Sequence, residues 1–290
     1  MIKIFISDVD GTLLNGQGKV SLNNQKAIKL INEQHMHFIL NSGRDYPMLL
    51  AAIKDFDIVC EAMCLNGAQY FDDRGQLKAA YPLDKKDIKN ILAIANKLKI
   101  KRIHYFSESG RYLVCEPQLL KHQLYEDFQV MFRGEIMDNL DQFMESNQLY
   151  DICYSALTHE AIHEHDIMKI EFIFENKTQK QDAIELFKAM NTLNISSSHI
   201  NNLEINAVAA SKAAMAKKVC KLYNVSEDEV VVIGDSYNDI SMLEAFKYSF
   251  VMGQAPEAVK KYANYQTAGI DEDGFADCVD LILNWEERND

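Results

Sequence analysis

The chain has 290 residues, 48% of them hydrophobic and 25% charged, and a formal net charge of −13. This composition is typical of a globular protein, and no apolar run approaches the roughly 20 residues that span a bilayer. The acidic balance argues against a nucleic-acid partner, because binding to a phosphate backbone requires a basic surface. Six scattered cysteines form no zinc-type pair, and the first residues lack a cleavable signal. We therefore predict a cytoplasmic protein with reduced thiols and no membrane partner.

The first 80 residues alternate between short apolar runs and segments with helical periodicity. A strand, a helix behind the N-cap Ser21, a second strand, a second helix and a hairpin are predicted in this order. Their ranges are 2–7, 22–34, 36–40, 46–56, and 69–71 with the strand that follows the turn at 72–75.

The last 80 residues repeat this alternation. Residues 230–233 form a β-branched run, which is typical of a strand buried on both faces, as parallel strands are. A helix over 212–223 precedes this strand, and a helix, a strand over 249–252 and another helix follow it. Alternation of this kind at both ends of the chain predicts an α/β fold with a doubly wound parallel sheet.

The middle of the chain follows a different pattern, in which helices are mixed with strands that alternate or pair. The predicted helices cover residues 85–98 and 179–190, and the predicted strands cover 102–106, 112–115, 167–174 and 203–205. We therefore expect a core domain of residues 1–82 and 207–290, with an inserted α+β cap domain of residues 83–206.

Asp8 and Asp10, in the pentapeptide at residues 8–12, are the sharpest chemical feature. Residues two apart project from the same side of an extended chain, and two such carboxylates repel each other unless a divalent cation relieves them. One can act as a nucleophile and the other as a proton shuttle, and Gly11 allows a tight turn after the pair. A pair of solvated acids in a turn is the structural alternative, which the complete pentapeptide disfavours.

Further polar groups follow apolar strands, where ligands of parallel sheets bind. Ser42, Gly43 and Arg44 offer a hydroxyl, backbone N–H groups and a guanidinium, which suit phosphate oxygens. Lys212 opens a helix, where a cation is unfavourable unless an anion lies near. Asp235 follows the buried strand and is placed to complete a magnesium site with Asp8. Taken singly, these features have ordinary explanations: a turn, a solvated lysine and a capped helix start.

In this order, the motifs resemble those of the haloacid dehalogenase-like (HAD) hydrolases, in particular the Cof-type branch, subclass IIB, with its large inserted cap. The resemblance covers nearly the whole chain. The segments that carry it are Asp-Val-Asp-Gly-Thr at 8–12, Ser-Gly-Arg at 42–44, Asn-Gly-Ala at 66–68, Ser-Lys at 211–212, Gly-Asp-Ser-Tyr-Asn-Asp at 234–239, Met-Gly at 252–253 and Glu-Asp-Gly at 272–274.

The resemblance implies an aspartyl-phosphate mechanism. Asp8 would attack phosphorus, and Asp10 would protonate the leaving alcohol and then activate the water that clears the intermediate. Mg²⁺ would be held by the carboxylates of Asp8 and Asp235 and by the backbone carbonyl of Asp10.

The resemblance also implies a phosphate clamp. Ser42 and Lys212 would hold the transferring phosphoryl group, Asn238 would assist beside it, and Asp239 would support Lys212 or the surroundings of the metal. Phosphoryl transfer depends mostly on positioning and charge neutralisation, which such a set supplies.

Three positions depart from the family pattern. Gln254 and Ile270 stand where members often carry Asn, and Ala213 follows Lys212 where a glycine is common. Gln254 and Ile270 border the expected site, so they affect its geometry and not the reaction.

Residues 159–163 match His-Glu-x-x-His, the zinc-protease signature. A protease needs both histidines on one helix and a third ligand at a suitable spacing, and the next histidine, His165, is only two residues on. We therefore interpret this segment as a solvated part of the cap, with contacts of His159, Glu160 or His163 to a substrate as an open alternative.

The sequence thus predicts a magnesium-dependent phosphatase that hydrolyses phosphate monoesters of small metabolites, with sugar phosphates as the favoured class, as a monomer or homodimer. The cap is expected to close over the site and select the leaving group. A phosphomutase of the same fold and a non-enzymatic phosphate-binding or regulatory protein are the two alternatives.

Overall fold

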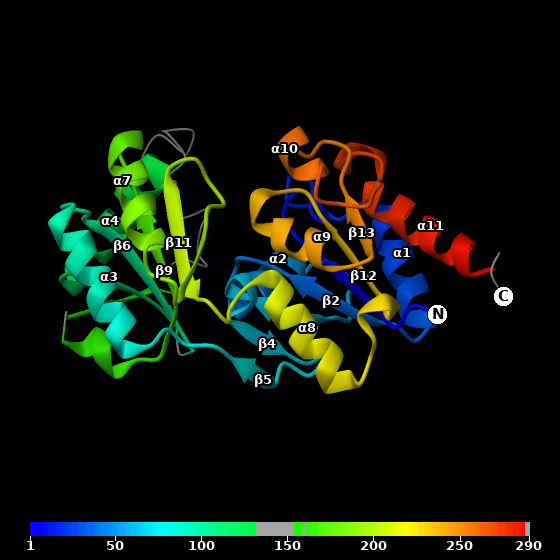
Figure 1. Ribbon diagram of the computed structural model, residues 1–290, viewed down its shortest axis with the longest axis horizontal. Helices are drawn as coiled ribbons and strands as arrows, with labels where there is room; N and C mark the ends of the chain where they lie inside the picture. The colour runs from blue at the N-terminus through cyan, green and yellow to red at the C-terminus, as the bar shows by residue number, and fades with distance from the viewer. Residues whose placement is uncertain (109, 132–153, 159, 288–290) are drawn as a thin grey trace. The chain divides into compact units, whose positions relative to one another are not determined.

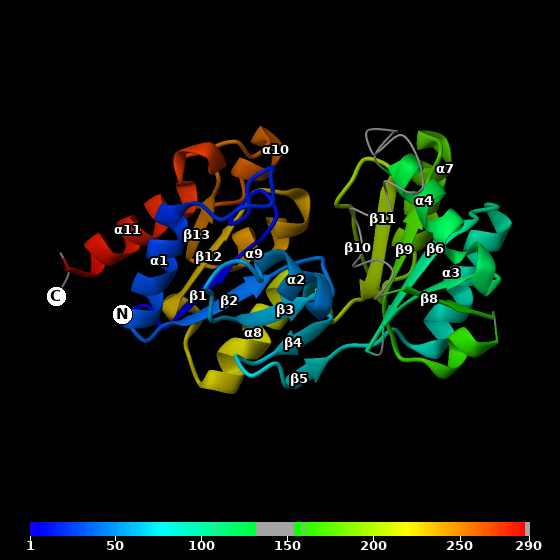
Figure 2. The same ribbon diagram turned by 180° about the vertical axis from the view of Figure 1, so that it is seen from behind.

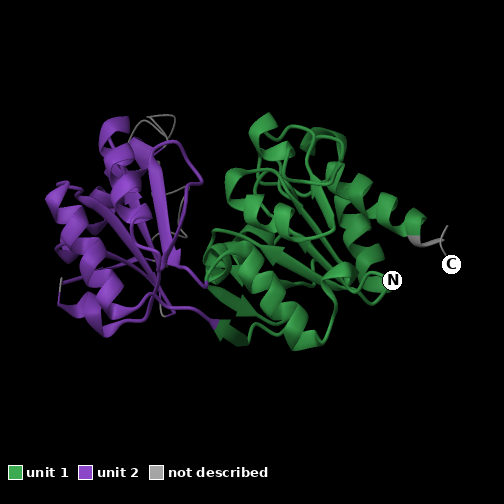
Figure 3. Ribbon diagram, viewed as in Figure 1, with its two compact units in different colours: residues 1–79, 210–290 green, residues 80–209 purple. Residues whose placement is uncertain are grey.

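The computed structural model describes residues 1–108, 110–131, 154–158 and 160–287. The chain forms two compact units, one of residues 1–79 and 210–290 and the other of residues 80–209 (Figure 3). Both chain ends belong to the first unit, so the second unit is inserted into it. Within the described ranges, no helix has the length and apolar character needed to cross a membrane.

The first unit is built on an eight-stranded sheet in the order β14-β13-β12-β1-β2-β3-β4-β5. All pairings from β14 to β3 are parallel, and β4 is antiparallel to β3. The strands are β1 (Ile4–Ser7), β2 (His37–Asn41), β3 (Glu61–Cys64), β4 (Gln69–Phe71), β5 (Leu77–Ala80), β12 (Val230–Gly234), β13 (Tyr248–Val251) and β14 (Tyr265–Gln266).

Helices cover both faces of this sheet. Figure 1 shows α8 and α9 in front of the sheet, and Figure 2 shows α1 on the other side. Phe275 of α11 packs edge-on against Phe5 and Phe38, with ring centroids 5.5 and 5.9 Å apart. The helices are α1 (Leu22–Glu33), α2 (Tyr46–Ile53), α8 (Lys212–Tyr223), α9 (Ile240–Ala245), α10 (Glu257–Lys260) and α11 (Gly274–Glu287).

The central strands are apolar because helices cover both of their faces. Every residue of β1 and of β12 is buried, which agrees with their continuous apolar sequences. Helices α1 and α2, which follow β1 and β2, begin at side-chain caps, with Ser21 accepting from the Asn24 N–H and Asp45 from the Met48 N–H. Helix α2 ends earlier than the predicted range of 46–56, because the Phe56 N–H bonds to the Ile53 carbonyl and closes a tighter turn.

The second unit contains a six-stranded sheet in the order β10-β11-β9-β6-β7-β8. Helices α3 and α7 pack on one face through an apolar core in which Phe172 stacks on Phe187, and α4 packs on Leu113 and Ile173 at a separate cluster. The elements are α3 (Lys85–Lys97), β6 (Arg102–Ser107), β7 (Arg111–Val114), α4 (Leu120–Met131), β8 (Tyr154–Leu157), β9 (Ile167–Ile173), α7 (Lys177–Lys188), β10 (Leu193–Ser196) and β11 (Asn202–Ala207). All pairings are antiparallel except β7 with β8.

The predicted fold class, a doubly wound parallel sheet with an inserted α+β unit, is confirmed. The segment with the protease signature forms a 3₁₀ turn over Ala161–Glu164 in place of the α-helix that a zinc protease needs. His159, the first residue of that signature, lies outside the described residues. Cys153 does too, and the other five cysteines are free thiols.

Candidate active site

The predicted site residues lie where neighbouring parallel strands end. Asp8 follows β1, Ser42 follows β2, and Asp235 follows β12. The registers pair Ser7 with Leu40 and with Ile233, so these three strands end at the same edge. The Asp8 N–H donates to the Ile233 carbonyl at 2.9 Å and continues the β1–β12 ladder up to the carboxylate. The strand ends therefore gather side chains that are far apart in sequence.

Lys212 is the cation of this edge. Ser211 caps α8 by accepting from the Ala214 N–H at 3.0 Å, which makes Lys212 the first helical residue. The Lys212 side chain is fully buried, and its Nζ binds Oδ1 of Asp8 and, at 2.6 Å, Oδ1 of Asp239. Burial lowers the pKa of Lys212, but the carboxylates of Asp239 and Asp8 outweigh burial and hold this pKa above its usual value. A charged lysine at a helix start is thus explained by two buried anions.

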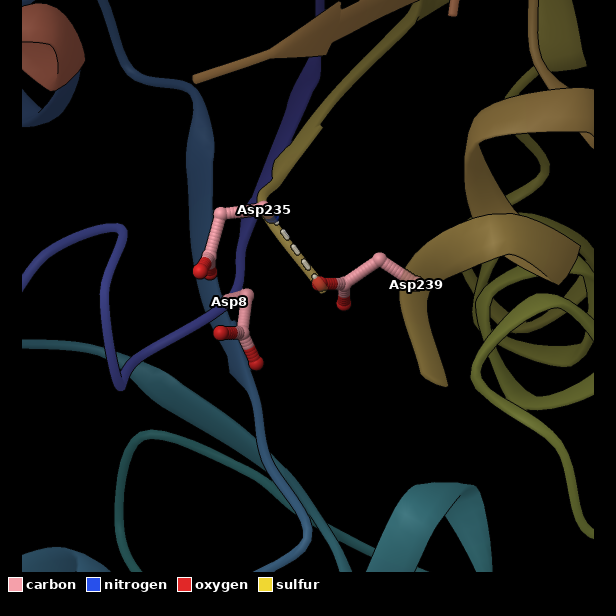
Figure 4. Close-up of side chains that lie close together, drawn as sticks. All are labelled: Asp8, Asp235 and Asp239. Carbon is pink, nitrogen blue, oxygen red and sulfur yellow. Dashed lines mark hydrogen bonds between the residues drawn. The ribbon is translucent and has the colours of Figure 1, made fainter. Parts of the chain in front are cut away.

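Asp239 orders the loop after β12. Its Oδ2 accepts the backbone N–H groups of Asp235 at 3.0 Å and Ser236 at 2.9 Å, while its Oδ1 accepts Lys212. Both carboxylate oxygens are therefore engaged within the protein. Figure 4 shows Asp239 reaching toward the Asp235 backbone, beside the carboxylates of Asp8 and Asp235. Asp239 links Lys212 to the turn that carries Asp235.

Asp235 is held by the loop that follows Asp8. Its Oδ1 accepts the buried Thr12 hydroxyl at 2.8 Å. Gly11, at φ +85°, lies so close that a Cβ atom on it would come within 2.5 Å of Asp235 Oδ2. Only glycine combines this backbone conformation with this approach, which accounts for the Asp-Gly-Thr part of the first motif.

Asp8 and Asp235 are costly to ionise without a further cation. Burial, followed by repulsion from Asp239, raises the pKa of Asp8 well above its usual value, against the opposing effect of Lys212. Burial and Asp239 likewise raise the pKa of Asp235 to about 6. An additional positive charge would favour both carboxylates in their ionised form.

Three carboxylates, of Asp8, Asp235 and Asp239, place one oxygen each within 4.8 Å of one another and could hold a metal ion. Hydrogen bonding distinguishes them, because Asp239 uses both oxygens, whereas Asp8 and Asp235 each use only Oδ1 among the described residues. The free Oδ2 atoms of Asp8 and Asp235 are the hard oxygen donors that Mg²⁺ prefers. The residues present therefore fit a magnesium ion at Asp8 and Asp235.

Asp10 and Arg44, both predicted at the site, contact each other. The guanidinium of Arg44 donates two hydrogen bonds to Asp10, from Nε to Oδ2 at 2.8 Å and from Nη2 to Oδ1 at 2.7 Å. The Asp10 side chain is 55% exposed, whereas Asp8 is buried. The structure thus separates the two aspartates of the first motif into a buried one beside Lys212 and an exposed one beside Arg44.

The remaining predicted residues, Ser42, Gly43 and Asn238, lie in the turns that follow β2 and β12. Ser42 is buried, and its Oγ accepts the Arg44 N–H at 3.1 Å across Gly43. Asn238 lies in the 3₁₀ turn Tyr237–Asp239 and accepts the Ser236 hydroxyl at 2.8 Å. The structure brings Asp8, Lys212, Asp235 and Asp239 into direct or shared contact. The roles of Ser42, Gly43, Arg44 and Asn238 at a phosphate stay predictions.

Two contributors to the site were not assigned roles from the sequence. Thr12 holds Asp235 through its hydroxyl, although it stands inside the recognised pentapeptide. Gly67 has φ +87°, and a Cβ atom at this position would come within 2.3 Å of the Ser211 carbonyl oxygen, so only glycine fits. The Asn-Gly-Ala motif therefore allows its turn to approach the start of α8, next to Lys212.

With this geometry, a family can be assigned. Residues 5–279 match the family model of the haloacid dehalogenase-like hydrolases, and the chain belongs to this family. Phosphatase YwpJ of Bacillus subtilis (strain 168) is 27% identical over 291 residues, which cover 97% of this chain and 100% of the relative. The 5-amino-6-(5-phospho-D-ribitylamino)uracil phosphatase YcsE of the same organism is 24% identical over 278 residues, or 96% and 94% of the two chains.

Solved structures agree in fold. A haloacid dehalogenase-like hydrolase from B. subtilis superposes with a TM-score of 0.80 at 24% identity, over 96% of this chain and 99% of the other. A sugar phosphatase of HAD subclass IIB gives a TM-score of 0.75 at 18% identity, over 97% and 99%. The predicted Cof-type HAD hydrolase is confirmed, and the chain is an enzyme of the phosphatase kind within that family.

Proposed function

We propose that the protein is a magnesium-dependent phosphatase that hydrolyses phosphate monoesters of small metabolites through a phosphoryl group carried on Asp8. The observation that carries the proposal is the position of Lys212, fully buried and bound to both Asp8 and Asp239 beside Asp235. A protein that only bound phosphate would not need a buried carboxylate at the place where the anion has to sit. The arrangement fits a nucleophile whose charge is balanced before an anionic substrate arrives.

Asp8 is the nucleophile in this proposal. Its Oδ1 accepts a hydrogen bond from Lys212, which restrains the carboxylate beside a positive charge. Bound Mg²⁺, held by Asp8 and Asp235, would supply charge neutralisation for the phosphoryl oxygens. Lys212 adds a second positive charge beside the nucleophile. Attack by Asp8 forms its bond to phosphorus while the bond to the leaving oxygen breaks.

Asp10 is the proton shuttle. It lies two residues after the nucleophile and is exposed, so its carboxylate can reach a leaving oxygen or a water molecule. The bidentate contact with Arg44 occupies both oxygens of the Asp10 carboxylate. Release of Asp10 from Arg44 is therefore part of forming the acid that protonates the leaving alcohol.

The substrate class is proposed from the named relatives. One structural neighbour is a sugar phosphatase, and two curated relatives act on 5-amino-6-(5-phospho-D-ribitylamino)uracil. Both kinds of compound carry the phosphate on a short polyhydroxylated carbon chain. We favour phosphate esters of sugars or sugar alcohols as substrates.

The metal part of the proposal predicts that EDTA abolishes phosphate release from p-nitrophenyl phosphate and that added Mg²⁺ restores it. We expect a loss of roughly 10²- to 10³-fold, since a cation in the site stabilises the transferring group by several kcal/mol. The assay is run at pH 7.5, above the pKa of about 6 of Asp235, so that this ligand is ionised. Full activity in excess EDTA would rule out the metal assignment.

The same assay separates the alternatives. It contains no sugar acceptor, so a phosphomutase would release no phosphate continuously, whereas a phosphatase transfers the group to water. Negligible rates with p-nitrophenyl phosphate and across a panel of sugar phosphates, nucleotides and cofactor phosphates would favour a binding or regulatory protein.

A further inference from the structure

Gln254 joins two loops that border the active site. It follows β13, and its Nε2 donates to the Gly11 carbonyl at 2.6 Å while its Oε1 accepts the Ile270 N–H at 2.9 Å. Its side chain thus bridges the loop after Asp8 and the loop after β14. Gln254 and Ile270, the two positions that depart from the family pattern beside the site, are in contact with each other.

The loop that contains Ile270 is held in place by hydrogen bonds to neighbouring elements. The Gly253 N–H bonds to the Ala268 carbonyl, and the Ala268 N–H bonds to Asp277 of α11, both at 3.0 Å. The backbones approach so closely that a Cβ on Gly253 would come within 2.9 Å of the Gly269 nitrogen. This loop is already held by β13 and α11. The hydrogen bond from Gln254 to Gly11 therefore restrains the backbone at Gly11 and has little effect on the loop at Ile270.

Gly11 is the hinge between Asp10 and Thr12. Its N–H donates to the Leu14 carbonyl at 2.9 Å, and its carbonyl accepts Gln254. The peptide groups on both sides of Gly11 are therefore pinned, although its φ of +85° belongs to a residue with wide conformational freedom. The Asp10–Gly11 peptide is planar and trans, so the Gly11 N–H and the Asp10 carbonyl point in opposite directions. The hydrogen bond that fixes the Gly11 N–H therefore also fixes the direction of the Asp10 carbonyl.

We infer that Gln254 is a positioning residue for catalysis. Its hydrogen bond fixes the Gly11–Thr12 peptide, and through this peptide the Thr12 hydroxyl that holds Asp235. This rests on the proposed function, in which Asp8 and Asp235 hold Mg²⁺. Substitution of a residue that orients metal ligands without touching the metal typically lowers the affinity of the protein for the metal by roughly 10- to 100-fold.

The test compares Gln254→Met with Gln25→Met. Methionine keeps the length of glutamine and its neutral charge but forms neither hydrogen bond. Gln25 is a matched control on α1, where its Nε2 donates to the Val20 carbonyl at 3.0 Å, so it loses the same kind of bond outside the site. The dissociation constant of Mg²⁺ is measured by calorimetry without substrate, alongside p-nitrophenyl phosphate hydrolysis and the melting temperature of the metal-free protein.

We expect Gln254→Met to weaken Mg²⁺ binding roughly tenfold and to lower kcat, with an unchanged melting temperature because the side chain is exposed. Gln25→Met should match the wild type. Wild-type Mg²⁺ affinity in Gln254→Met would overturn this inference while the wild-type activity upholds the proposed function. A parallel fall in melting temperature would also overturn it, by showing a general structural role. Failure of the wild type to bind Mg²⁺ would overturn both.

Discussion

Asp8→Asn is expected to abolish turnover, with a loss of at least about 10⁴-fold, while the protein stays folded. The amide retains the shape of the carboxylate but cannot attack phosphorus, and removal of a nucleophile from a covalent mechanism costs nearly all of the rate. The fold is expected to persist because burial and Asp239 raise the pKa of Asp8, so an ionised Asp8 opposes folding at neutral pH. Lys212 keeps Asp239 as its partner in the variant.

This prediction is measured as phosphate release with p-nitrophenyl phosphate, together with circular dichroism and a thermal melt. Asp228→Asn, an exposed substitution of the same kind in the turn Glu227–Glu229, is purified in parallel and should keep wild-type activity. A contaminating phosphatase would raise the apparent activity of Asp8→Asn. Both variants are therefore purified by the same procedure before the assay. Near-normal activity in a clean Asp8→Asn preparation would refute the role of Asp8.

Lys212→Met is expected to produce the largest loss of stability, about 3–5 kcal/mol, together with loss of activity. Lys212 is the shared partner of Asp8 and Asp239, and all three are buried. Removal of the cation takes away the partner that these two buried carboxylates share, and breaking a buried ion pair from one side costs this much. Unfolding in urea gives the free energy directly.

Two further variants show whether the charge is responsible. Lys217→Met removes a lysine of the same helix whose side chain is 41% exposed and paired with Glu227 at 3.0 Å, and should change stability by less than about 1 kcal/mol. Addition of Asp239→Asn to Lys212→Met removes one of the stranded carboxylates and should recover part of the stability without recovering activity. If Lys212→Met were as stable as Lys217→Met, the buried charge cluster would not exist in solution.

The strand ends and the residues that follow them could be predicted from the sequence, because local patterns determine both. An apolar run over 230–233 and the acid at Asp235 are neighbours in the chain, and the parallel order of strands brings such ends to one edge. The short strands β8 and β10 and the helix α4 were not predicted, since their mixed polar and apolar sequences carry little periodicity.

The side-chain pairings could not be predicted, because they join residues brought together only by the folded sheet. No local signal links Thr12 to Asp235 or Gln254 to Gly11, and Arg44 was expected at a phosphate and not on Asp10. The motif resemblance identified Asp8, Lys212 and Asp235 as site residues. Which oxygen of each carboxylate is already engaged, and hence which can hold a cation, follows only from distances.

The central claim, a phosphoryl group carried on Asp8, is tested most directly by a burst experiment with Asp10→Asn. p-Nitrophenolate leaves without a proton, so the first step survives, whereas the water that clears the intermediate is no longer activated. We predict a rapid burst of one p-nitrophenolate per protein and, after acid quenching, a peptide that carries one phosphoryl group on Asp8 by mass spectrometry. Steady release of p-nitrophenolate without a burst, from a protein with no phosphoryl group on Asp8, would contradict the mechanism.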